Sequence, residues 1–241
     1  MRWRHFRLPF CILFTCNTLC LIRTITLLCI PQELFSARID TSSTTLDSAM
    51  SELLANPHVL AKLRAELDRV VGIDRWVEHS DIPHLPYLQA VVKETFRKNP
   101  LGPLLVPRIS SESSNVGGYT IPKGTRLFVN TWAIGHDPEV WKDPEVFMPE
   151  RFLVAGANPA GLKGNSFELL PFGSGRRICP GMGLAVTIVE LTLSTLIHSL
   201  EWDLTPGQKS IDMSDKMALV CDRVHPLLVL PAKARLHTVK K

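Results

Sequence analysis

The residues best suited to chemistry lie in one short stretch, residues 172–181, which reads Phe-Gly-Ser-Gly-Arg-Arg-Ile-Cys-Pro-Gly. Cys179 follows two arginines, and Pro180 is typical of the first turn of a helix. Positive charge and the N–H groups of a helix start favour the thiolate, which is the form that binds metals. Glycine lets such a loop curve closely around a flat or bulky group. The stretch therefore predicts a reactive or metal-binding cysteine rather than an inert core residue.

Two further patterns involve arginine. Glu94 and Arg97 are three residues apart in Glu-Thr-Phe-Arg, which puts them on one face of a helix. Arg151 lies among prolines and aromatic residues in Phe-Met-Pro-Glu-Arg-Phe. Each pattern is common in proteins, but their order along one chain with the cysteine stretch is specific.

A thiol enzyme is a different interpretation of Cys179. A nucleophilic cysteine needs a base, and the sequence offers His198 and His225 as partners. Neither histidine lies in a recognisable catalytic context. No Cys-x-x-Cys pair or zinc-type Cys/His spacing occurs either, which argues against a structural zinc site.

Charge is concentrated at one end of the 241-residue chain. Four arginines within residues 1–30 account for the whole net charge of +4, and the remainder is neutral. A neutral body argues against nucleic acid as the main partner, because phosphate binding needs a concentrated basic face. We expect the basic C-terminal tail, which includes Lys233 and Arg235, to be a solvated end.

Residues 1–30 differ from the rest of the chain. A basic start precedes a mostly apolar run over residues 8–22, as in a signal or signal-anchor segment. The run is short for a bilayer-spanning helix, and Arg23 would interrupt a longer one. A membrane anchor and a non-native leader both remain open for this segment.

Residues 31–241 have the pattern of one helix-rich mixed domain. Apolar periodicity and Pro, Gly or Asn-Pro boundaries predict four helices: residues 31–56, a second ending at Gly72, residues 86–98 and residues 181–200. The hydroxyl side chains of residues 41–45 are poor helix formers. The last helix is apolar around most of its girth, so we expect it to be buried. Short strands are expected at residues 104–106, 119–121, 127–129 and 227–230, with an ordered loop over residues 137–170.

Together these motifs resemble the C-terminal half of the cytochrome P450 family, most of all its plant microsomal members. The resemblance covers about residue 31 to the C-terminus and implies a mainly α fold with small β sheets, an incomplete P450 fold. Five positions match the haem-binding signature: Phe172, Gly175, Arg177, Cys179 and Gly181. Three match the family's Glu-Arg-Arg core network: Glu94, Arg97 and Arg151.

The resemblance also implies a role for each matched residue. Haem b would be the cofactor, with Cys179 as the axial thiolate that favours O–O cleavage. Arg177 and Arg108 would pair with haem propionates. Residues 37–41 align with the distal oxygen-binding stretch, where Asp40 and Thr41 would relay protons.

Two features depart from the family pattern. Arg38 stands where a small residue is usual beside the oxygen site, and a long cation there would crowd the pocket or pair with Asp40. Family members are also considerably longer, and their N-terminal half has no counterpart here. Asn99, where histidine is common, and His136, often an arginine, are smaller departures.

The resemblance implies a haem-thiolate monooxygenase that inserts one oxygen atom from O2 into an apolar small organic substrate. Its electrons would come from NADPH through cytochrome P450 reductase, on the cytosolic face of the endoplasmic reticulum membrane. The alternative is a truncated, catalytically inactive haem-binding or structural remnant of such an enzyme. We expect the chain as written to have little or no activity, because of Arg38 and the missing half.

Overall fold

The computed structural model describes the backbone of residues 18–154, 161–208 and 210–236, and side chains from residue 37 onward within those ranges. The chain forms two compact units, Met1–Asp40 and Thr41–Lys241. Helix α1 (Thr18–Ala55) contains the boundary between them. Residues 1–17, which include part of the apolar run expected to be an anchor or a leader, lie outside the described residues.

Helix α1 begins earlier than the sequence predicts. The expected start was residue 31, yet the chain is already helical at Thr18, and Pro31 lies inside the helix. An interior proline lacks the N–H that would bond four residues back, and its ring crowds that carbonyl, which is why the sequence predicts a start there; the helix nevertheless continues through this position. The hydroxyl-rich residues 41–45 are also helical. The Thr45 hydroxyl donates to the Thr41 carbonyl oxygen at 2.8 Å, so it is satisfied within the helix.

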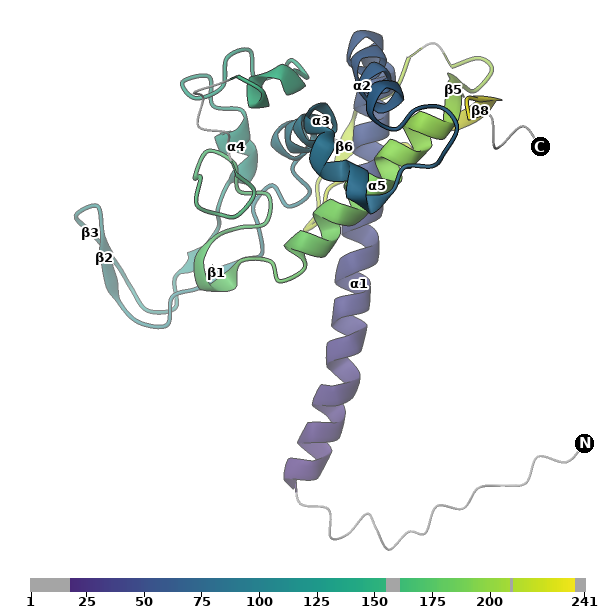
Figure 1. Cartoon of the computed structure of the whole chain (residues 1–241). Helices are drawn as coiled ribbons and strands as arrows, with labels where there is room; N and C mark the ends of the chain where they lie inside the picture. Colours follow the sequence, from purple (N-terminus) through teal and green to yellow (C-terminus); the bar gives the residue numbers. More distant parts are fainter. Residues whose placement is uncertain (1–17, 155–160, 209, 237–241) are drawn as a thin grey trace, which may run out of the picture. The chain divides into compact units, whose positions relative to one another are not determined.

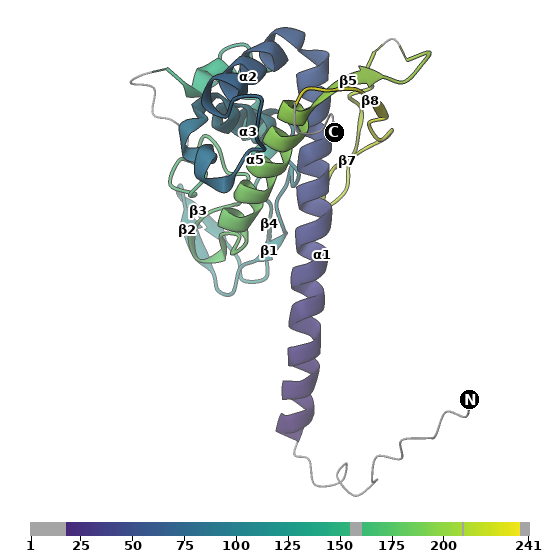
Figure 2. The same cartoon turned by 45° about the vertical axis from the view of Figure 1, so that its right-hand side comes forward.

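The second unit is built on helices α2 (Pro57–Val70), α3 (Pro86–Lys98) and α5 (Met182–Ser199), which pack against one another (Figures 1 and 2). A proline at the first turn starts both α2 and α3. Gly72, with φ of 78°, follows the end of α2, and the predicted bounds of α3 are confirmed. The core contains Leu53, Leu63 and Leu88 among its fully buried side chains.

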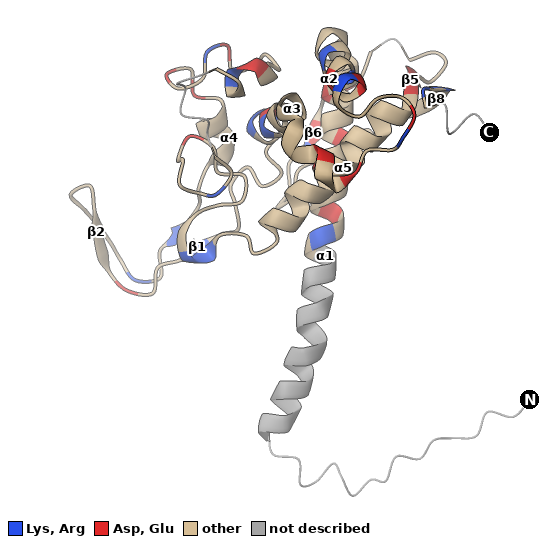
Figure 3. Cartoon of the chain, viewed as in Figure 1, with Lys and Arg blue, Asp and Glu red and all other residues tan. Residues whose placement is uncertain are grey.

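Helix α5 is only partly buried, contrary to the expectation from its composition. Leu193 and Ile197 are fully buried, whereas Leu184 is 53% exposed. Glu190 is its one acidic or basic residue apart from His198, and Figure 3 shows the helix almost wholly in the colour of uncharged residues. Helices α2 and α3 and the 3-10 helix η1 (His79–His84) contact α5, and the buried residues of α5 all lie from Val189 onward. Burial of α5 therefore follows these contacts rather than apolar content.

The described residues contain four two-stranded antiparallel sheets, so the expected mainly α fold with small β sheets is confirmed. The pairs are β1 (Arg108–Ile109) with β4 (Arg126–Leu127), β2 (Ser114–Val116) with β3 (Tyr119–Ile121), β5 (Leu200–Leu204) with β8 (Val229–Ala234), and β6 (Asp215–Lys216) with β7 (Asp222–Arg223). The hairpin β2–β3 confirms the expected strand at residues 119–121.

Other strand predictions need correction. Residues 104–106 form a turn instead of a strand, because Leu105 has φ of 49°, which extended backbone does not allow. Of residues 127–129 only Leu127 is in a strand. Strands β1, β2, β5, β6 and β7 were not predicted, and β8 spans Val229–Ala234 rather than residues 227–230.

The short helix α4 (Thr131–Gly135) and the 3-10 helices η1 (His79–His84), η2 (Pro149–Phe152) and η3 (Gly175–Arg177) complete the unit. Helix η2 falls inside the expected loop over residues 137–170, of which residues 155–160 lie outside the described residues. Helix η2 lies against α3, and this contact brings Arg151 to Glu94.

Candidate functional site

Glu94 and Arg97 form a bidentate ion pair on the buried face of α3. Arg97 Nε donates to Glu94 Oε2 and Nη2 donates to Oε1, both at 2.8 Å. Both side chains are completely buried. An ion pair removed from water needs its remaining donors and acceptors satisfied as well, because each unpaired group is costly.

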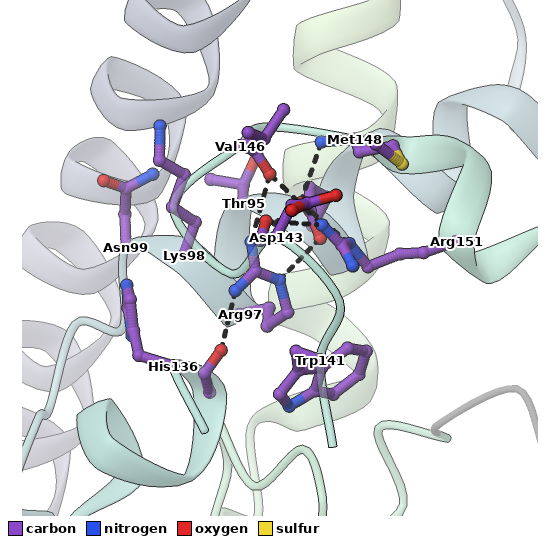
Figure 4. Close-up of polar contacts among 12 residues, drawn as sticks. Thr95, Arg97, Lys98, Asn99, His136, Trp141, Asp143, Val146, Met148 and Arg151 are labelled. Atoms are coloured by element: carbon purple, nitrogen blue, oxygen red, sulfur yellow. Dashed lines mark hydrogen bonds and ion pairs between the residues drawn. The ribbon is translucent and has the colours of Figure 1, made fainter. Parts of the chain in front are cut away.

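Arg151 is the third member of this cluster. Its Nε donates to Glu94 Oε1 at 3.2 Å, and the backbone N–H of Met148 donates to the same oxygen at 2.9 Å. The Glu94 carboxylate therefore accepts four hydrogen bonds, two of them from a segment more than fifty residues away. Figure 4 labels the three donor residues, Arg97, Met148 and Arg151.

Backbone carbonyl oxygens accept the remaining N–H groups of the two arginines. Arg97 Nη1 donates to Gly135 at 2.6 Å, and Arg151 Nη1 donates to Lys142 at 2.8 Å. Val146 accepts from both guanidiniums, at 3.4 and 3.2 Å. A Cβ at position 135 would lie 2.5 Å from the Arg97 carbonyl oxygen, so only glycine fits this approach. The residues expected to form a network are thus brought together, and their structural role stays a prediction.

Glu150, which precedes Arg151 in η2, contacts side chains of both α2 and α3. Lys62 Nζ of α2 lies 2.6 Å from Glu150 Oε1, and the Tyr87 hydroxyl of α3 donates to the same oxygen at 2.9 Å. Burial alone would raise the pKa of Glu150, but these hydrogen bonds lower it overall. Burial and the Glu150 carboxylate raise the pKa of Tyr87. Sequence reasoning missed this cluster, for which the position of Glu150 beside Arg151 was the only signal.

The far end of α3 is held by a buried carboxylate on α1. Lys98 Nζ lies 3.0 Å from Glu52 Oε1, and Asn99 Nδ2 donates to the same atom at 3.0 Å. The amide of Asn99 thus supplies a donor at the position where histidine was the expected family residue.

The stretch of residues 172–181 folds into a tight loop that ends at the start of α5. Gly173 and Gly175 have φ of 72° and 68°, which L side chains rarely adopt. The Cys179 N–H donates to the Phe172 carbonyl oxygen at 2.9 Å, which closes the loop. Cys179 is exposed, and a Cβ at Gly181 would lie 3.8 Å from its Sγ. The loop therefore presents the thiol with no side chain at Gly181 beside it.

Cationic side chains accompany this loop. Arg108 Nη2 lies 3.8 Å from where a Cβ of Gly173 would be, which places that guanidinium beside the loop. Arg176 and Arg177 are exposed. Within the described part of the chain, the structure records no ion pair for Arg108, Arg176 or Arg177.

The other predicted residues lie elsewhere on the chain. Asp40 is exposed and belongs to the first unit, as does Arg38, while Thr41 is half-buried and belongs to the second. His198 is buried, and its Nε2 lies 2.6 Å from the Gly72 carbonyl oxygen; burial lowers its pKa. His225 lies 3.9 Å from Asp212. Among the described residues neither histidine is recorded in contact with Cys179, which leaves the thiol-enzyme interpretation without a visible base.

Comparison with known proteins places these features in a family. The family model for cytochrome P450 matches residues 26–229. The chain belongs to the cytochrome P450 family. It is 50% identical over 207 residues to an iridoid oxidase of Catharanthus roseus, covering 85% of this chain and 39% of that protein. It is also 50% identical over 202 residues to a flavonoid 3'-monooxygenase of Petunia hybrida, covering 83% of this chain and 40% of that protein.

Solved cytochrome P450 structures share the fold. A zebra fish cytochrome P450 structure with abiraterone matches with a TM-score of 0.74 and 37% identity, covering 83% of this chain and 46% of that one. The chain therefore spans less than half of the cytochrome P450s it matches here.

Haem is the cofactor that this family implies, and the residues present fit it. Cys179 offers an exposed thiol, and thiolate is a known haem ligand in cytochrome P450s. The absence of a side chain at Gly181 leaves the sulfur accessible from that side. The guanidiniums of Arg108 and Arg177 are suited to carboxylates such as propionates.

Proposed function

We propose that this chain is the thiolate- and haem-binding part of a monooxygenase that inserts one oxygen atom from O2 into an apolar small organic molecule. The observation that carries the proposal is the exposed Cys179 thiol in a glycine-rich loop at the start of α5. The family supports it, as do relatives named as a flavonoid 3'-monooxygenase and an iridoid oxidase.

Each residue of the site has a defined task in this proposal. Cys179 holds the iron, and the positive φ values of Gly173 and Gly175 set the loop path that presents it. Arg108 and Arg177 bind the propionates. Bound haem would supply the iron that activates O2. Asp40 and Thr41 move protons toward the oxygen site, the roles that the family resemblance implies for an acid and a hydroxyl at these positions.

Membership of the family supports a proposal for the redox partner and the location. We infer that electrons come from NADPH through cytochrome P450 reductase, on the cytosolic face of the endoplasmic reticulum membrane. Among the described residues one helix, α5, is long and apolar enough to cross a bilayer, with mean hydropathy 1.4 over 18 residues. Its buried face packs on α2 and α3, and core helices have the same composition, so α5 does not support a membrane location.

The alternative is a haem-binding or structural remnant without turnover. Arg38 favours it, since a guanidinium at the aligned oxygen site is a steric obstacle. Exposed apolar side chains such as Leu184 and Val106, which are 53% and 69% exposed, also leave apolar surface uncovered in this chain.

Two experiments separate these functions. First, the 241-residue chain is loaded with haem, and turnover of an apolar substrate is followed with NADPH and the reductase. We expect haem binding with little or no product, whereas turnover would rule out the remnant.

Second, residues 31–241 are fused to the N-terminal half of an active relative, with and without Arg38→Gly. Product from the glycine chimera alone assigns the obstacle to Arg38, and equal rates make that arginine harmless. Failure of both chimeras to oxidise substrate despite bound haem would contradict the monooxygenase proposal.

A further inference from the structure

The cluster of Glu94, Arg97 and Arg151 contains more positive than negative charge. It holds two guanidiniums and one carboxylate, and the three side chains are 0%, 0% and 9% exposed. A net positive charge away from water is unfavourable unless neighbouring groups with partial negative charge face it. The backbone carbonyl oxygens of Gly135, Lys142 and Val146 supply part of this negative charge.

The remaining face of the cluster is covered by Trp141. Its ring centroid lies 5.6 Å from the guanidinium carbon of Arg97 and 5.9 Å from that of Arg151. Trp141 is 7% exposed, so these contacts are shielded from water. Tryptophan has the aromatic face that attracts cations most strongly, and the attraction grows when the pair is desolvated. Figure 4 shows Trp141 beside the two arginines.

The indole is also fixed in place by its own hydrogen bond. Trp141 Nε1 donates to the Ile134 carbonyl oxygen at 3.1 Å, and Arg97 Nη1 donates to the carbonyl of the next residue, Gly135. Each of the two side chains therefore donates to one of two consecutive backbone carbonyls at the end of α4.

We propose that Trp141 is a positioning residue, whose aromatic face compensates the excess positive charge of the cluster and so holds the guanidiniums of Arg97 and Arg151 against Glu94. A residue of α3 that is next to the cluster in sequence also contacts the cysteine loop. Phe96, the neighbour of Arg97 on α3, contacts Phe172 of that loop with ring centroids 5.2 Å apart.

The decisive test changes the charge distribution of the ring and leaves its size nearly unchanged. Tryptophans carrying one, two or more fluorines are introduced at position 141 of the full chain, and the urea midpoint is measured by circular dichroism. Fluorine weakens the negative face of the ring, so we expect the midpoint to fall stepwise, by about 0.5 M urea across the series. The matched control is the same series at Trp202, whose ring has no recorded guanidinium or ammonium partner among the described residues and whose midpoint should stay constant. Equal midpoints across the series at position 141 would overturn the proposal.

Conservative replacement gives a second readout. Trp141→Phe keeps an aromatic face and should retain more of the wild-type midpoint than Trp141→Leu, although both lose the indole N–H. Equal losses would contradict a role for the aromatic face, and the fluorine series still decides if the leucine variant fails to fold. Both measurements are made without haem, so their outcome does not depend on the proposed function.

Discussion

The rings of Phe96 and Phe172 meet edge to face, with centroids 5.2 Å apart and an interplanar angle of 69°. Phe96 lies between Glu94 and Arg97 on α3, and Phe172 opens the loop that carries Cys179. The carbonyl of Phe172 accepts the Cys179 N–H. This one ring contact therefore links the buried ion cluster to the candidate ligand.

The ring contact predicts energetic coupling between the two residues. In a double-mutant cycle with Phe96→Leu and Phe172→Leu, the losses in unfolding free energy should be non-additive by about 0.5–1.5 kcal/mol, the usual contribution of an aromatic pair. Urea denaturation of the four proteins measures this. As a control, Phe96→Leu and Phe167→Leu should be additive, since Phe167 is 71% exposed. Additivity in the first cycle would show that the rings are packed independently.

Replacement of Cys179 tests the assignment of the iron ligand. After reconstitution with haem, the ferrous CO complex of the wild-type chain should have a thiolate-type Soret band, and Cys179→Ala should lose it because no sulfur remains at the loop. Cys221→Ala is the matched control, since Cys221 is the other free cysteine among the side chains that the structure describes, and this change should leave the band unchanged. Retention of the band in Cys179→Ala would refute the assignment.

Loss of Glu94 is expected to be severe. Glu94→Ala leaves two buried guanidiniums without their carboxylate, and breaking a buried ion pair in this way costs about 3–5 kcal/mol. We expect loss of folding or of haem retention, measured by urea denaturation and haem absorbance. Glu145→Ala, at an exposed carboxylate nearby, should change stability by less than about 0.5 kcal/mol. In the Arg38→Gly chimera, a Glu94→Ala variant that folds and retains haem, but loses the turnover of its parent chimera, would indicate a catalytic role instead.

The raised pKa of the Glu190 carboxyl should make the free energy of unfolding depend on pH. Burial raises its pKa from 4.5 to about 7, and the charge of Lys93 offsets this only in part. The folded chain therefore binds this proton more tightly than the unfolded chain. The resulting stabilisation is complete below pH 4.5 and is lost as the pH rises through about 7. Glu190→Gln cannot ionise, so relative to wild type it should gain up to about 3 kcal/mol between pH 4.5 and 8. Urea midpoints across this range test the prediction, and parallel pH curves for the two proteins would contradict it.

Features that depend on neighbours in sequence could be predicted from the sequence. Prolines at positions 57 and 86 start α2 and α3, because a missing N–H costs nothing in the first turn. The glycines around Cys179 were expected to let its loop curve, and two of them have positive φ. The i, i+3 spacing placed Glu94 and Arg97 on one face of α3, and side-chain reach within one helical turn makes their contact local.

Only the tertiary structure decided which distant groups complete these local features. Arg235 was expected in a solvated tail, yet its Nη2 donates to Asp68 Oδ2 at 2.7 Å and its Nη1 donates to the His198 carbonyl at the end of α5. The carbonyls that accept from Arg97 and Arg151 are backbone groups, which every residue possesses and no pattern identifies. Which of them faces a guanidinium depends on how the segment between α4 and η2 packs against α3. Sequence spacing determines which side chains meet within one helical turn. Contacts between distant segments depend on how the whole unit packs.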